Sequence, residues 1–167
     1  MAFEVPPLTY AYDALEPYIN KRTMELHHDL HHAAYVNKFN AAIEGTPFAS
    51  KTAEEIVTDL ASVPENIRSV VRNHGGGHVN HALFWAIMGP KKGGEPTGEL
   101  GEALKSVFGS FANFQEEFNT KGTNQFGSGW VWLVLGKEGK LAVQATPNQD
   151  TPLSEGKHVI MGNGVWE

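Results

Sequence analysis

The sequence predicts an α+β protein with a helical N-terminal half and a C-terminal half that mixes helices with a small antiparallel sheet. Through the first half, apolar residues recur at intervals of three and four, as in amphipathic helices. After residue 128 the period changes, and two short segments rich in Trp, Val and Leu flank a glycine-containing turn, which is typical of a β-hairpin. Residues 89–94, of sequence GPKKGG, form a linker between the halves.

The helical half opens with an extended arm, in which Asp13 is a candidate cap for a short helical turn over residues 14–17. The first long helix is predicted from about residue 21 to residue 43 by the spacing of its apolar positions. A capping box, formed by Thr52 and Glu55, opens the next helix, which runs to about residue 60.

After a break at Pro64, a helix through residues 70 and 71 leads into three consecutive glycines at residues 75–77. A glycine inside a helix costs roughly 1 kcal/mol relative to alanine. We therefore expect these glycines where the backbone packs closely against a neighbour. Helical spacing resumes over residues 78–88.

The C-terminal half contains two short predicted helices between residues 100 and 118, broken near Gly109. Residues 128–135 and 140–145 are the two strands of the predicted hairpin. Residues 158–161 are a candidate third strand. The chain has no internal repeat.

Composition excludes several classes of protein. The 167 residues carry a net charge of -6, which disfavours nonspecific binding to nucleic acid or to an anionic membrane surface. The chain has no cysteine, so a disulfide, a thiolate nucleophile or a Cys-ligated metal site is excluded, and any metal must be held by histidine and carboxylate. No secretory signal and no apolar stretch long enough to span a bilayer are present, so we expect a cytoplasmic protein.

The strongest candidate site lies in residues 24–35, of sequence MELHHDLHHAAY. His27, His31 and Tyr35 are spaced i, i+4, i+8, and at roughly 100° per residue they share one stripe of a helix. Since the stripe includes two core-type residues, we expect the polar groups to face inward and form a site. The core-type residues are Met24 and Phe39, and the histidines expected on the adjoining, more solvated face are His28 and His32.

A second histidine motif follows the three glycines. His78 and His81 are three residues apart and therefore lie on one side of a helix. The motif is compatible with helix packing eased by glycine, or with ligands on a second helix that face His27.

Two motifs of the C-terminal half could complete such a site. Trp130 and Trp132 alternate onto one face of a strand, where they would form core or a dry wall beside a metal. Gln149 lies in the N-Q-D sequence of residues 148–150 and could hydrogen-bond a bound water, or belong only to a turn.

Taken in order, these motifs resemble the iron/manganese superoxide dismutase family. The resemblance rests on His27, His31 and Tyr35, on GHVNHALFW at residues 77–85, on FGSGWVW at residues 126–132 and on NQD at residues 148–150. It covers essentially the whole chain. It implies an N-terminal antiparallel helical hairpin domain over residues 1–89, a C-terminal α/β domain with a small antiparallel sheet over residues 90–167, and a metal between them.

The resemblance also implies a function and a set of residues. The activity is conversion of two superoxide radicals to dioxygen and hydrogen peroxide by one Mn, or alternatively Fe, per chain. His27 and His81 would be metal ligands, and His31 and Tyr35 would line the substrate entry and help to deliver protons. Gln149 would contact metal-bound solvent, which is typical of the manganese type, because iron types place this glutamine at the position of Gly77. The pocket walls would be Phe84, Trp85, Trp130 and Trp132, and the family forms homodimers or homotetramers.

The sequence departs from the family at its C-terminal end. Gly164 stands where the family has a ligand aspartate, and the second ligand of that motif, a histidine, would follow Glu167. Glu167 matches the glutamate that reaches across the dimer to the partner's ligand histidine. Because two imidazoles should hold Mn²⁺ only weakly, we expect a C-terminally truncated chain that is inactive or nearly so, whether it is a fragment or a degenerate paralogue.

Two alternatives remain open. Glu25 and His28 match the Glu-x-x-His pattern of di-iron carboxylate proteins, although the second match, at residues 155–158, falls in a predicted loop. The other alternative is a non-catalytic metal-binding or interaction remnant of the dismutase family that uses His27, His31, His78 and His81. Bound Mn or Fe with turnover would favour the enzyme, and Zn or Cu without turnover would favour the remnant.

Overall fold

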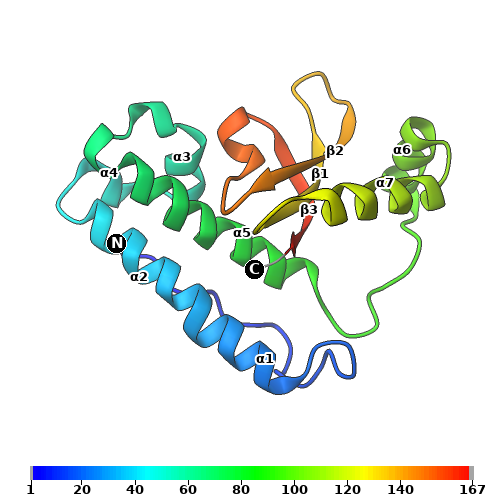
Figure 1. Ribbon diagram of the computed structural model, residues 1–167, viewed down its shortest axis with the longest axis horizontal. Helices are drawn as coiled ribbons and strands as arrows, with labels where there is room; N and C mark the ends of the chain where they lie inside the picture. The colour runs from blue at the N-terminus through cyan, green and yellow to red at the C-terminus, as the bar shows by residue number, and fades with distance from the viewer. Residues whose placement is uncertain (1, 166–167) are drawn as a thin grey trace. The chain divides into compact units, whose positions relative to one another are not determined.

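The computed structural model describes residues 2–165, and the chain divides into two compact units, Met1–Lys92 and Gly93–Glu167 (Figure 1). Their boundary falls within the predicted linker. In the described part of the chain, no helix combines the length and apolar content needed to cross a membrane.

The first unit is built on two long helices. The first consists of α1 (Lys21–Glu25), η1 (Leu26–His32) and α2 (Ala33–Ile43), and it covers the range predicted from periodicity. Its start is fixed by Asn20, whose side chain accepts a hydrogen bond from the Thr23 N–H. The η1 segment is π-helical, which the α-helical pattern did not predict.

The short helical turn expected over residues 14–17 does not form as a helix, and the chain makes a series of turns there instead. Glu16 precedes Pro17, and a residue before proline is disfavoured in the α conformation. This expectation was therefore wrong for a local steric reason.

The second long helix comprises α4 (Glu65–Val70), a further π-helical segment η4 (Val71–Gly75) and α5 (Gly76–Ile87). It runs antiparallel to the first, because His27 meets His81, His32 meets His78 and Phe39 meets Gly75. Three short elements connect the two helices: η2 (Pro47–Ser50), α3 (Ala53–Thr58) and η3 (Leu60–Ser62). Both hydrogen bonds of the predicted capping box, between Thr52 and Glu55, are present at the start of α3.

The three consecutive glycines lie inside this second helix, where the backbones approach closely. A Cβ on Gly75 would lie 3.0 Å from the Phe39 ring, and one on Gly77 would lie 2.6 Å from the Tyr35 ring. Aromatic side chains of the first helix thus occupy the space of the missing methyl groups. This explains why glycine is used despite its cost to a helix.

The second unit contains two helices and a three-stranded sheet. The helices are α6 (Gly98–Phe108) and α7 (Phe111–Asn124), separated at Gly109, which has a positive φ of 83°. The strands are β1 (Gly129–Leu135), β2 (Leu141–Pro147) and β3 (His158–Val165), with the short helix η5 (Pro152–Glu155) before β3. They are antiparallel in the order β2-β1-β3, so β1 is central. The predicted α+β class is confirmed, and β3 extends further than expected.

The core of the second unit lies between its helices and one face of the sheet. It contains residues from α6, α7, β1 and β2: Leu104, Phe114, Phe118, Val131, Leu133, Leu141 and Val143. Because side chains alternate along a strand, Trp130 and Trp132 of β1 lie on the other face. Both indoles are almost fully buried.

Candidate metal centre

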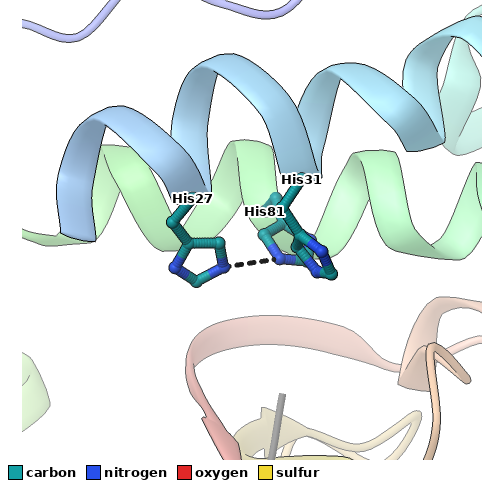
Figure 2. A group of neighbouring side chains, drawn as sticks. All are labelled: His27, His31 and His81. Atoms are coloured by element: carbon teal, nitrogen blue, oxygen red, sulfur yellow. Dashed lines mark hydrogen bonds between the residues drawn. The ribbon is translucent and has the colours of Figure 1, made fainter. Parts of the chain in front are cut away.

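Three histidines of the first unit bring their ring nitrogens together between the two long helices. His27 and His31 come from η1 and His81 comes from α5, and one nitrogen of each lies within 4.8 Å of the others (Figure 2). The shortest separation, 3.0 Å, joins Nε2 of His27 to Nε2 of His81. The sequence predicted all three residues as members of a site, and the structure brings them together.

The orientation of His81 is fixed by its own helix. His81 is fully buried, and its Nδ1 lies 2.7 Å from the carbonyl oxygen of Gly77, one helical turn earlier. A carbonyl only accepts, so Nδ1 carries the proton and donates it. In the neutral ring, Nε2 then keeps its lone pair, which is the arrangement that a metal-ligating histidine needs. Sequence reasoning missed the Gly77 carbonyl, because spacing does not reveal the rotamer that brings Nδ1 to it.

The π-helical segment aligns the predicted stripe. In an α-helix each step of four residues overshoots a full turn by roughly 40°. In a π-helix each residue turns by less, because the hydrogen bonds span five residues. The four steps from His27 to His31 lie in η1, so together they rotate about the helix axis by less than four α-helical steps would. This smaller rotation offsets the excess rotation between His31 and Tyr35. The ring centroids are accordingly close, 5.3 Å for the first pair and 4.9 Å for the second.

The expected facing of the other two histidines was wrong. His28 and His32, placed on the more solvated side by sequence reasoning, are buried at 7% and 0% exposure. The buried stripe runs one position further along, through Met24, His28, His32, Val36 and Phe39, while His27 is half-buried at its edge. Sequence reasoning assigned Met24 and Phe39 to the stripe of His27, whereas the structure buries them on one face with His28 and His32. Hydrogen-bonded neutral histidines can occupy such core positions.

Each buried histidine has specific partners. His28 contacts the Pro6 carbonyl oxygen through Nε2 at 2.9 Å and Asp29 through Nδ1 at 2.7 Å. Burial lowers the pKa of His32 to about 2, so its ring is neutral. Burial also lowers the pKa of His78, which lies against His32 rather than facing His27.

Two aromatic residues of α5, Phe84 and Trp85, border the histidine cluster. The Trp85 indole stands edge-on to the His27 imidazole, with centroids 4.9 Å apart and planes at 80°. The Phe84 ring lies 6.0 Å from the same imidazole. Tyr35 lies 5.3 Å from the His81 ring. The cluster therefore has an aromatic surround within the first unit.

The predicted residues of the second unit form a network of their own. The Trp130 indole N–H donates to Oε1 of Gln149 at 3.1 Å, and both side chains are buried. The Trp132 indole N–H donates to the Thr146 hydroxyl at 2.8 Å, and the two indoles stack at 5.0 Å. Sequence reasoning missed Thr146, although its place opposite Trp130 in the strand register follows from the hairpin.

Gly164, where the sequence departs from the family, lies on β3. Gly164 pairs with Trp130 across the sheet. Glu167, predicted at a dimer interface, lies outside the described residues.

The di-iron alternative finds no support in the first long helix. The Glu25 carboxylate pairs with Lys21 and Arg22 on the outer surface. Both ring nitrogens of His28 are committed to other partners. Within residues 2–165, the three-histidine group is the one cluster of potential ligands of this kind.

Comparison with known proteins places both units in one family. Residues 2–89 match the family described as iron/manganese superoxide dismutases, alpha-hairpin domain, and residues 96–167 match the corresponding C-terminal domain. The chain is 56% identical to a protein named superoxide dismutase [Mn] from Listeria monocytogenes, over 100% of this chain and 83% of that protein. It is 55% identical, with the same coverage, to a protein of the same name from Listeria innocua.

These matches extend over both units and agree with the residue motifs and the fold described above. The expected activity, superoxide dismutation by a manganese- or iron-dependent oxidoreductase, is thereby confirmed at the level of the family. The chain belongs to the iron/manganese superoxide dismutase family.

Proposed function

We propose that this chain holds one manganese ion through Nε2 of His27 and Nε2 of His81. Two nitrogens 3.0 Å apart can both lie about 2.1 Å from a single ion, a usual metal–imidazole bond length. Because Nδ1 of His81 donates to the Gly77 carbonyl, Nε2 of His81 keeps its lone pair for the ion. This pair of Nε2 atoms is the observation that carries the proposal.

Manganese rather than iron is supported by two features. The relatives reported above are named as manganese enzymes. The chain also has glycine at position 77 and glutamine at position 149, the combination that resembles the manganese type. A glutamine at position 77 would have to displace the Tyr35 ring, since even a Cβ there would lie 2.6 Å from it.

The bound metal would supply one-electron cycling between its 2+ and 3+ states, so that one superoxide is oxidised to dioxygen and a second, with two protons, is reduced to hydrogen peroxide. The chain's own residues would position the substrate and supply protons. The His31 and Tyr35 rings lie 4.9 Å apart beside His81. Their imidazole and phenol groups would hold and pass protons to the reduced product.

The family resemblance alone implies that Gln149 acts on water bound to the metal. Its Oε1 accepts from the Trp130 indole N–H, which leaves the Nε2 group as the donor of the amide. A donor fixed in this way favours one protonation form of a bound water and so tunes the potential of the metal. Trp130 and Trp132 would wall this region with apolar surface.

The C-terminal departures bear on affinity. With Gly164 in place of the family's aspartate, the two imidazoles provide no negative charge to offset a trivalent metal. Weak manganese binding and slow turnover by this chain stay predictions. We also propose, on the resemblance alone, a cytoplasmic homodimer or homotetramer in which Glu167 lies at the interface.

The test compares single histidine substitutions. His27→Ala and His81→Ala should each abolish manganese binding, measured as metal per chain after loading, and superoxide decay in stopped flow. His158→Ala is the matched control, because this exposed histidine lies on β3, outside the cluster. One manganese per chain retained in either cluster variant would contradict the proposal. Zinc or copper binding without turnover in the unsubstituted chain would favour the non-catalytic remnant.

A further inference from the structure

Behind the proposed ligand pair lies a buried chain of hydrogen bonds that the metal site itself does not use. The indole N–H of Trp85 donates to Nδ1 of His32 at 3.0 Å. Nε2 of His32 lies 2.9 Å from Nδ1 of His78. His32 is fully buried and joins the two long helices at this point, and Trp85 and His78 are nearly so.

The direction of these hydrogen bonds follows from the chemistry of the groups. An indole nitrogen only donates, so Nδ1 of His32 must accept. Because Nδ1 of His32 accepts, the ring proton of His32 resides on Nε2. Nε2 then donates to Nδ1 of His78, whose own proton must lie on its Nε2. One tryptophan N–H thereby fixes the tautomers of two histidines.

The same tryptophan borders the proposed ligand His27. Its indole stands edge-on to the His27 imidazole at 4.9 Å, with an interplanar angle of 80°. Its main-chain carbonyl accepts from the Tyr10 hydroxyl at 3.0 Å. Hydrogen bonds thus fix the Trp85 side chain through His32 and the Trp85 backbone through Tyr10. Together they restrict the indole to one orientation beside the His27 ring. The centroid of the His32 ring also lies 5.4 Å from that of the His81 ring.

We propose that His32 is a positioning residue: by accepting from Trp85 and donating to His78, it holds the indole against His27 and so keeps Nε2 of His27 directed at His81. The consequence for metal binding rests on the proposed function of His27 and His81. The direction of the hydrogen bonds does not depend on that function, so the role of His32 and the proposed metal site can be refuted independently.

The first experiment reads the tautomers directly. Long-range ¹H–¹⁵N NMR of the labelled full chain, loaded with diamagnetic Zn²⁺ and again without added metal, should show the proton on Nε2 in both His32 and His78. In Trp85→Phe, which keeps an aromatic ring and removes the N–H donor, the His32 signals should move toward a mixture of tautomers. A proton found on Nδ1 of His32 in the unsubstituted chain would overturn the proposal, whatever the metal result.

The second experiment measures the effect on the metal. Trp85→Phe and His32→Ala should each weaken Mn²⁺ binding by about tenfold, the size typical of losing support behind a metal ligand. They should also broaden the Mn²⁺ electron paramagnetic resonance spectrum, because His27 would sample more orientations. His32→Asn places an amide oxygen near the position of Nδ1 and can still accept from Trp85, so it should recover most of the affinity and the narrow spectrum.

The matched control is Asn40→Ala. Asn40 lies on the same long helix and bonds both the N–H and the carbonyl oxygen of Phe3, so its loss should lower thermal stability without touching the cluster. If Trp85→Phe and His32→Ala lower the melting temperature as Asn40→Ala does, yet leave manganese affinity and the spectrum unchanged, the role of His32 is only structural and the proposal is wrong. Should His32→Ala fail to fold, Trp85→Phe still decides between these outcomes, because it removes the indole donor and leaves His32 in place.

Discussion

Gly77→Ala tests whether the close approach of the two long helices is what positions Tyr35. The added Cβ would lie 2.6 Å from two ring carbons of Tyr35, well inside van der Waals contact. The clash is with a side chain packed between His31 and His81 rather than with a mobile surface group. To restore an ordinary separation, the ring or its helix must move by about 1 Å.

The expected magnitudes follow from this contact. Overpacking of an interior typically costs about 1–3 kcal/mol, and replacing a helical glycine by alanine returns about 1 kcal/mol. The net loss of stability should therefore be at most about 2 kcal/mol, or a few degrees in melting temperature. The effect on activity should be larger, because a displacement of about 1 Å in a reacting group can cost on the order of 10²-fold.

The assay combines thermal unfolding with stopped-flow decay of superoxide, at equal manganese content. Gly122→Ala in α7 is the matched control: it makes the same change inside a helix, but its Cβ would lie 3.2 Å from a Val131 methyl carbon, which can shift slightly. We expect Gly122→Ala to be close to neutral in both measurements. If Gly77→Ala were as stable as the parent and dismutated superoxide at the same rate, the packing of Tyr35 on Gly77 would not control the site.

Three further predictions concern stability and ionisation. Thr146→Val should lower the free energy of unfolding by about 1–3 kcal/mol in urea, because the buried Trp132 N–H loses its acceptor, and Thr146→Ser should retain most of that stability. Because the pKa of His32 is lowered from 6.5 to about 2 in the folded chain, the unfolded chain binds a proton at this histidine at higher pH than the folded chain does. The contribution of His32 to the free energy of unfolding should therefore be complete above about pH 6.5 and fall by roughly 2 kcal/mol at pH 5. Urea midpoints of chelator-treated protein that stay constant from pH 7 to pH 5 would refute this prediction. Asp29→Ala should let the raised pKa of Tyr12 fall toward 10.0, because it removes the hydrogen bond to Asp29 that is the main cause of the shift. An unchanged ultraviolet titration of Tyr12 would show that the cause lies elsewhere.

Periodicity and capping predicted the main helices and strands of the fold, although not the π-helical segments or the full length of β3. The first long helix begins and ends where the apolar spacing indicates, and the Thr52–Glu55 capping box forms as expected. The change from a helical to a strand period near residue 128 correctly predicted the sheet. These features depend on local sequence alone, which is why a single sequence contains them.

The facing of individual histidines was harder to predict. Sequence reasoning placed His28 and His32 on the more solvated face because they adjoin the stripe assigned to the core, whereas both are buried. Whether a histidine is buried depends on partners far along the chain: Pro6 for His28, and His78 and Trp85 for His32. No local pattern contains this information, because the partners are chosen by tertiary packing.

The difference between local sequence signals and tertiary contacts also separates metal ligands from the groups that orient them. The family resemblance implies His27 and His81 as ligands, and in our proposal they hold the metal; a ligand must be one of a few residue types on a suitable face. The groups that orient them are a glycine carbonyl and, in our proposal, a tryptophan N–H acting through His32, and the first of these is a backbone group with no side-chain signature. Their roles are defined by the direction of hydrogen bonds, which follows from which groups can only donate or only accept once they are in contact. A metal site of this kind is therefore predictable in its ligands from sequence, whereas the geometry that makes those ligands effective has to be derived from the fold.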